Sequence, residues 1–304
     1  MASLFLLVFI SLMVMDVLKN AGLIVVGLLL TAGALVVRRA EPGLFLEQAA
    51  LALGLAGQGL FVFGVAEMSP ERVTALAVFA LEAVLLLVSA DLIQRFLSAC
   101  AASVALLYAL HDGLPVVLGL VAFCALAHEL LLRQASLEAG PWGERATLTA
   151  HALLTVILTV LLFIAADAGG LDANHPEVMR ALLTLGLAAV TLVSAWRVLA
   201  ESHAAPGGAA GVTLFVALSL TTLLTFHLPG FITAVGALML GLHRRSVVLV
   251  GLAVVALLAF GVSYYYDLDL TLLAKSLALV GGGLVLLGLR LFVLRRFPLS
   301  AEVP

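Results

Sequence analysis

The chain has 304 residues, of which 64% are apolar and 11% are charged, and its mean hydropathy is +1.24. This composition excludes a soluble globular domain and predicts a polytopic membrane protein. The net charge of −3 provides no basic surface, which excludes nucleic acid as a partner. Cys100 and Cys124 both lie inside apolar runs, so neither a disulfide framework nor a CxxC-type site is expected.

Polar clusters divide the chain into twelve apolar runs, most of them close to the roughly 20 residues that cross a bilayer as a helix. The predicted helices are residues 2–18, 21–37, 44–66, 70–89, 96–110, 114–132, 146–165, 178–199, 211–226, 229–242, 246–264 and 270–293. The sequence therefore predicts an all-α transmembrane bundle, with residues 1–304 forming a single integral membrane domain. The two shortest runs leave an alternative open, in which ten helices span the membrane and residues 211–242 form a re-entrant hairpin.

The basic residues predict the orientation, because short cytoplasmic loops are enriched in Lys and Arg. With both termini in the cytoplasm, eleven of the fifteen basic residues lie at cytoplasmic helix ends. The four exceptions are Lys19, Arg72, Arg180 and Lys275. Residues 91–133 also resemble residues 211–245 in the spacing of His, Pro, Gly and Arg, which would indicate a weak parallel repeat.

Ionisable and amide side chains within the apolar runs are candidates for a functional site, because burying such groups in a bilayer is unfavourable. The candidate intramembrane polar site comprises Glu47, Gln58, Glu82 and Lys275. Glu82 lies near the middle of its run, and the eleven-residue spacing of Glu47 and Gln58 places both on one helix face. The functional interpretation is a polar path for a ligand or proton. The structural alternative is hydrogen bonding between helices, which Gly54, Gly57 and Gly59 would bring close together.

A second polar group precedes the last predicted helix, where the chain is expected to meet the outer face of the membrane. This outer-interface cluster comprises Tyr264, Tyr265, Tyr266, Asp267 and Asp269. Tyrosines are typical of the membrane interface, and the aspartates can cap the helix that follows. Lys275 lies about 9 Å deeper than Asp269 along a helix, so a pair between them is expected to fasten this helix.

His128, Glu129 and His151 raise the question of a metal site near the cytoplasmic helix ends. No HExxH or CxxC spacing supports one, so we expect interfacial anchoring and pairing between helix ends instead. Hydroxyl residues before His227 suggest either a polar path or bonding to carbonyls of their own helix. They are Ser219, Thr221, Thr222 and Thr225. We expect no metal and no cofactor.

Three runs resemble a known bacterial family. They are FLEQAALALGLAGQGL at 45–60, QRFLSA at 94–99 and SYYYDLDLTLLAKSLALVGGGLVLLGLR at 263–290. They look like the membrane-protein family catalogued as domain of unknown function 4401, which is similar to the 2157 series. The resemblance implies a multi-helix inner-membrane protein of unknown activity, often encoded beside a membrane-anchored protein with a GDYXXLXY motif. No catalytic residues are implied by the resemblance.

Two function hypotheses follow. The first is transport or small-ligand handling along the polar path, which predicts a water-accessible cavity that reaches Glu82. The second is a non-enzymatic scaffold for the neighbouring GDYXXLXY protein. An intramembrane lipid-modifying enzyme is a third class, but the sequence contains neither a GxSxG nor an HExxH motif, so we expect no enzymatic activity.

Overall fold

A computed structural model describes residues 20–40, 43–89, 91–110, 113–138, 140, 143–166, 175–202 and 205–267. Within these ranges the chain forms α-helices and no strand. The helices are α2 (Asn20–Arg39), α3 (Leu44–Ala66), α4 (Glu71–Val88), α5 (Leu92–Ala109), α6 (Leu114–Leu132), α7 (Gln134–Glu138), α8 (Gly143–Ala165), α9 (Pro176–Glu201), α10 (Ala209–Leu224), α11 (Pro229–His243) and α12 (Val247–Asp267).

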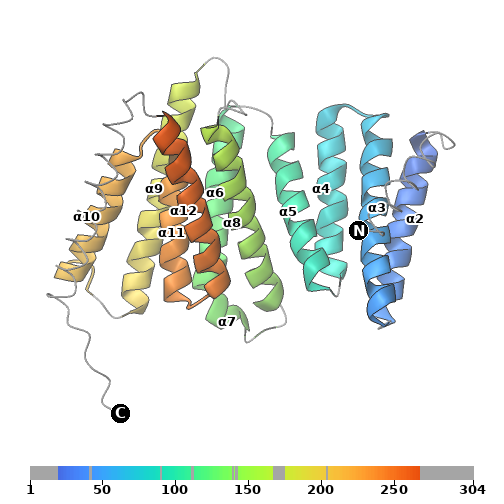
Figure 1. Ribbon diagram of the computed structural model, residues 1–304, viewed down its shortest axis with the longest axis horizontal. Coiled ribbons are helices and arrows are strands. Elements are labelled where there is room, and N and C mark those ends of the chain that lie inside the picture. The colour runs from blue at the N-terminus through green and yellow to red at the C-terminus, as the bar shows by residue number, and fades with distance from the viewer. Residues whose placement is uncertain are drawn as a thin grey trace, which may run out of the picture.

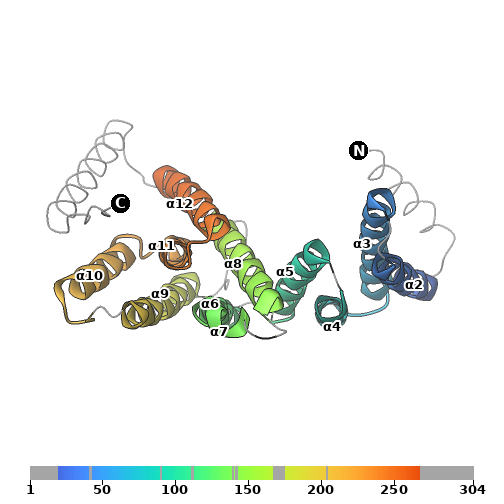
Figure 2. The same ribbon diagram turned by 90° about the horizontal axis from the view of Figure 1, so that it is seen from below.

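The long helices lie side by side and alternate in direction, as a membrane bundle requires (Figure 1). Six of them, α2, α3, α5, α6, α8 and α9, are long and apolar enough to cross a membrane. Seen along the helix axes, the bundle is elongated, with α2 and α3 at one end, α4 and α5 next to them, and the remaining helices beyond (Figure 2). The protein is therefore a multi-pass membrane protein built from packed α-helices.

Ten of the twelve predicted helices are confirmed, α3 and α6 with the predicted bounds. The other two, 2–18 and 270–293, lie outside the residues that the structure describes. Residues 134–138, which were predicted to be part of a loop, form the short helix α7. The helix α5 begins four residues earlier than predicted, because the Asp91 side chain caps it by accepting a hydrogen bond from the Gln94 amide at 2.8 Å.

The predicted short pair α10 and α11 forms two separate helices rather than a tightly packed hairpin. The helix α11 is buried against α9 and α12, whereas α10 packs on α9 and exposes much of its surface. Thr184 on α9 donates a hydrogen bond to the Phe226 carbonyl at 2.9 Å and so fixes the corner between them.

The hydrophobic core lies among α6, α8, α9, α11 and α12. On α6 the fully buried side chains recur at helical spacing, as they do on α8. These two stripes consist of Leu120, Cys124, Ala127 and Leu131 on α6, and of Ala150, Leu154, Ile157 and Leu161 on α8. They share the core with Leu187, Ile232 and Phe260 from the other three helices. Nearly all of this core lies outside α2 to α5.

Gly230 on α11 makes one of the closest contacts in this core. A β-carbon at this position would lie 2.1 Å from the ring of Phe260, which is almost fully buried. We expect Gly230→Ala to lower the free energy of unfolding by about 2 kcal/mol, because overpacking forces the ring to move. Thermal unfolding in detergent measures this effect. Gly261→Ala is the matched control, because a β-carbon there meets nothing within 4 Å; equal melting temperatures for the two variants would contradict the expected clash.

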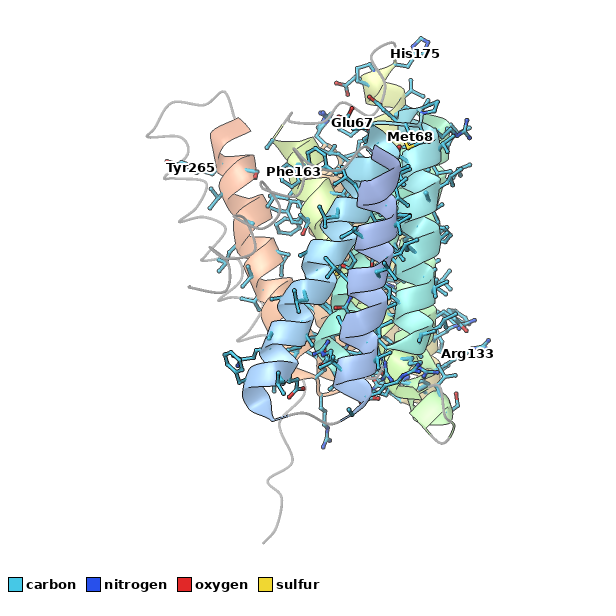
Figure 3. The ribbon with its side chains drawn as sticks, turned by 90° about the vertical axis from the view of Figure 1, so that its right-hand side faces the viewer. Glu67, Met68, Arg133, Phe163, His175 and Tyr265 are labelled. Atoms are coloured by element: carbon cyan, nitrogen blue, oxygen red, sulfur yellow. The ribbon has the colours of Figure 1, made fainter. Side chains whose placement is uncertain are left out.

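Arginines gather at one end of the bundle. Of the ten described arginines, eight lie at the end that contains Arg133, and Arg72 and Arg180 lie at the opposite end with Tyr265 (Figure 3). Ion pairs join neighbouring helices at the Arg133 end. They are Arg38–Asp91 at 2.7 Å, Arg95–Glu144 at 3.0 Å, Arg244–Glu201 at 2.9 Å and Glu129–Arg197, while Arg133 pairs with Glu129 of its own helix end. This segregation is the pattern that the basic residues predicted.

Candidate functional site

The candidate site lies between two helical hairpins, α2–α3 and α4–α5, and we call this contact region the seam. Each hairpin is tightly packed within itself, whereas α3 meets α4 over a much smaller area. The helices α2 and α3 approach so closely that a β-carbon on Gly57 would lie 2.6 Å from the Gly27 carbonyl oxygen. The hairpins are thus compact units, and the seam is the weakest contact between neighbouring units in this part of the chain.

Polar side chains are buried in the half of the seam toward the Arg133 end. Glu82 on α4 is 3% exposed and Gln58 on α3 is 9% exposed. Glu82 shares a hydrogen bond with Ser98 on α5, and Ser98 in turn accepts one from the Gln94 side chain at 3.2 Å. One oxygen of Glu82 and the Gln58 amide nitrogen have no hydrogen-bond partner. A buried polar atom without a partner is unfavourable, which makes this cluster a candidate for binding a further polar group.

A small cavity joins Gln58 to Gln94. Its volume is about 10 Å³, and Arg38, Gly54 and Leu85 also line it. A cavity of this size holds one water molecule at most. Below it, the Arg38–Asp91 ion pair joins α2 to the start of α5. The seam is therefore closed at the Arg133 end in this conformation.

A much larger groove occupies the other half of the seam, toward the Tyr265 end. Its volume is about 670 Å³. Its walls come from Val62 and Ala66 on α3, from Ala75 and Val78 on α4, and from Leu97, Cys100, Ala101, Val104 and Ala105 on α5. At its mouth lie Ser69, Glu71, Thr74 and Tyr108, and the Tyr108 hydroxyl donates a hydrogen bond to Glu71 Oε2 at 3.0 Å. The groove is thus apolar in its depth and polar at one end.

The structure brings together two of the four residues predicted for the intramembrane site. Gln58 and Glu82 belong to one buried cluster, but they are linked through Gln94 and Ser98 rather than directly. Glu47 is exposed in the first turn of α3. Lys275 lies outside the described residues. The close approach expected at Gly54 and Gly57 is confirmed between α3 and α2, whereas a β-carbon at Gly59 would meet nothing within 4 Å.

The outer-interface cluster is described only in part. The helix α12 extends through Tyr264, Tyr265, Tyr266 and Asp267, and the Tyr265 side chain is half-buried. Asp269 lies outside the described residues, as does its expected pair with Lys275.

The expectation that His128 anchors a helix end at the interface is wrong. Its side chain is 1% exposed in the core, where Nδ1 lies 2.8 Å from the Ser194 hydroxyl on α9. The expected pairing of helix ends is confirmed for Glu129, which pairs with Arg197 on α9. No group of three metal-binding side chains occurs within the described ranges. Thr221, Thr222 and Thr225 bond to carbonyls four residues earlier, which supports the structural alternative for them.

Sequence reasoning missed the α5 side of the seam. Gln94 and Ser98 are four residues apart and so share a helix face, which is a signal that the sequence does contain. The contact between Glu71 and Tyr108 joins residues 37 positions apart. It could be inferred only by assuming that α4 and α5 pack as an antiparallel hairpin.

The sequence model of a family described as a domain of unknown function, DUF4401, matches residues 1–296. The chain belongs to this family. The match confirms the resemblance drawn from residues 45–60 and 263–290. No curated protein and no solved structure matches this DUF4401 chain. The description of the DUF4401 family names no activity.

Proposed function

We propose that this protein binds a small amphipathic ligand within the bilayer and moves it along the seam. The observation that carries the proposal is the groove of about 670 Å³, which has apolar walls, a polar mouth and a buried polar cluster at its inner end. Its volume lies in the range of roughly 300–1,000 Å³ that is typical of small-molecule sites. The predicted cavity that reaches Glu82 is not found in this conformation, because Glu82 is 3% exposed and lines neither the groove nor the small cavity. The proposed path instead begins in the groove, beside Gln58 and Glu82.

The closed half of the seam supports a path that opens at one end at a time. Gln58 and Glu82 have unpartnered polar atoms, and a water-filled or ligand-bound state would supply partners for them. The ion pair between Arg38 and Asp91 holds this half shut. An alternating path requires such a closed end, and the loosely packed seam allows the two hairpins to move as units.

We further propose that the Arg133 end faces the cytoplasm and that the groove opens toward the outer leaflet. With the helices predicted at 2–18 and 270–293, both termini would then be cytoplasmic. The support is the positive-inside rule, because eight of the ten described arginines lie at this end. The resemblance to bacterial inner-membrane proteins makes that membrane the expected location.

The proposal is tested by filling the groove. Ala101 is a small, half-buried residue of its wall, so Ala101→Trp should occupy the space that the ligand needs. The control is Leu118→Trp, which places the same side chain at an exposed position on α6 outside the groove. Mass spectrometry of molecules that co-purify with each variant measures retention. We expect Ala101→Trp alone to retain roughly tenfold less ligand, which corresponds to a loss of about 1.4 kcal/mol of binding free energy.

Equal ligand retention by the unmodified protein and the two variants would show that the bound molecules are general surface lipids and would contradict the proposal. If Ala101→Trp instead releases a co-purifying membrane protein, the scaffold hypothesis replaces ligand handling. The melting temperature of each variant has to be measured alongside, so that loss of ligand is not mistaken for loss of fold.

A further inference from the structure

The groove has the depth of a single membrane leaflet. Its lining on α5 extends from Leu97 to Tyr108, and these eleven residue steps rise about 16 Å. The hydrocarbon core of a bilayer is about 30 Å thick, so the groove covers roughly half of it. Beyond Leu97 the seam is closed by the cluster that contains Gln58 and Glu82. A transmembrane helix of a partner would need a groove across the whole bilayer, so the depth favours a lipid over a partner helix.

The polarity of the groove follows the polarity of a lipid. Its polar residues gather at the mouth, at the end where headgroups lie, and the deeper wall is made of side chains such as Val78, Leu97 and Val104. The bilayer imposes the same order, with polar headgroups outside and acyl chains inside. An acyl chain along α5 would therefore place its headgroup beside Glu71 and Tyr108.

The charge at the mouth selects among headgroups. Glu71 is the one charged side chain among the described residues that line the groove, and neither Lys, Arg nor His lines it. The hydroxyl of Tyr108 donates a hydrogen bond to Glu71 Oε2 at 3.0 Å and fixes this carboxylate at the mouth. A fixed carboxylate attracts a cation and repels an anionic headgroup. Arg72, the next residue on α4, is exposed and is not part of the lining.

We infer that the ligand of the groove is a phospholipid with an ammonium headgroup, whose acyl chain lies along α5 and whose ammonium group contacts Glu71. This inference rests on the proposed function, because it names the class of ligand that the seam handles. The proposed ligand is a lipid of a single membrane leaflet. A soluble amine carries the same ammonium group but has no chain to fill the apolar depth of the groove.

The experiment uses the full chain in nanodiscs that contain a photoactivatable lipid. Phosphatidylethanolamine and phosphatidylglycerol that carry the same diazirine-labelled acyl chain are compared, and cross-linked peptides are identified by mass spectrometry. We expect cross-links to α4 and α5 residues such as Val78 and Val104, with the ethanolamine lipid preferred roughly threefold, as fits one partly exposed ion pair. Excess free ethanolamine should not compete.

Variants separate this inference from the proposed function. Glu71→Gln should remove the headgroup preference but keep the cross-links, while Glu71→Asp should keep part of the preference. Ala101→Trp should remove the cross-links of both lipids. Equal labelling by the two lipids in the unmodified protein, or an unchanged preference in Glu71→Gln, would overturn the headgroup assignment while the proposed function stands. Labelling that Ala101→Trp does not reduce would overturn both, and competition by free ethanolamine would reassign the site to a soluble amine.

Discussion

Replacing Arg38 with alanine should open the seam at its Arg133 end and expose residue 50 to water. Arg38 and Asp91 form a partly buried ion pair at 2.7 Å, and Arg38 also lines the small cavity beside Ala50 and Gln58. A hydrogen bond to a charged group contributes about 1.5 kcal/mol or more, so its loss should raise the population of the open state roughly tenfold. In the intact protein Ala50 is almost fully buried, and a cysteine there should react slowly.

The measurement is the rate at which a membrane-impermeant maleimide modifies Ala50→Cys in a background with Cys100→Ala. Cys124 can remain, because it is fully buried in the core. Arg39→Ala is the matched control, since this neighbouring arginine is exposed and its contact with the Val88 carbonyl is long, at 3.4 Å. Similar rates in the two arginine variants would show that the ion pair does not hold the seam closed.

Gly57→Ala should strongly destabilise the α2–α3 hairpin. The added carbon would lie 2.6 Å from the Gly27 carbonyl oxygen and 2.8 Å from the Thr31 amide nitrogen. These are backbone atoms of α2, so no side chain can rotate away and the two helices have to separate. We expect a loss of about 3 kcal/mol, at the upper end of the usual effect of overpacking. Close approach of small residues is also the main source of helix association inside a membrane.

Gly59→Ala provides the comparison, because it lies two residues further along α3 and its β-carbon would meet nothing within 4 Å. That variant should be as stable as the unmodified protein or slightly more stable, since alanine favours the helix by about 1 kcal/mol over glycine. Thermal unfolding of the two variants in the same detergent separates packing from helix propensity. Equal melting temperatures of the Gly57→Ala and Gly59→Ala proteins would contradict the close packing of α2 on α3.

The helices of this fold are readable from the sequence because each apolar run must satisfy its backbone hydrogen bonds within the bilayer. The ends of α3 and α6 are marked by polar residues and glycine, and both were predicted correctly. The predicted helix 96–110 begins four residues too late, because the charged residues from Asp91 to Arg95 favour a polar break, whereas the Asp91 side chain caps the helix. Hydropathy alone assigns a charged residue such as Asp91 to a loop, because it does not reveal that the side chain caps a helix through a hydrogen bond.

The site was harder to predict than the helices, because hydropathy does not say which helices are neighbours. Gln58 and Glu82 were correctly singled out as buried polar residues. Their link through Gln94 and Ser98 depends on the packing of α5, which is a property of the folded chain. His128 shows the same limit: its position near a helix end suggested the interface, but the helix face on which it lies turns toward α9 and α11. The groove, finally, is a gap between two hairpins and has no signature in any single run.

The most direct test of ligand handling at the seam is an experimental density map of the protein in lipid nanodiscs at side-chain resolution. We expect continuous elongated density that begins beside Glu71 and Tyr108, follows α5 to Leu97, and ends at the closed cluster of Gln58 and Glu82. A groove that is closed by direct packing of α3 against α4 and α5, with no room for a ligand, would contradict it.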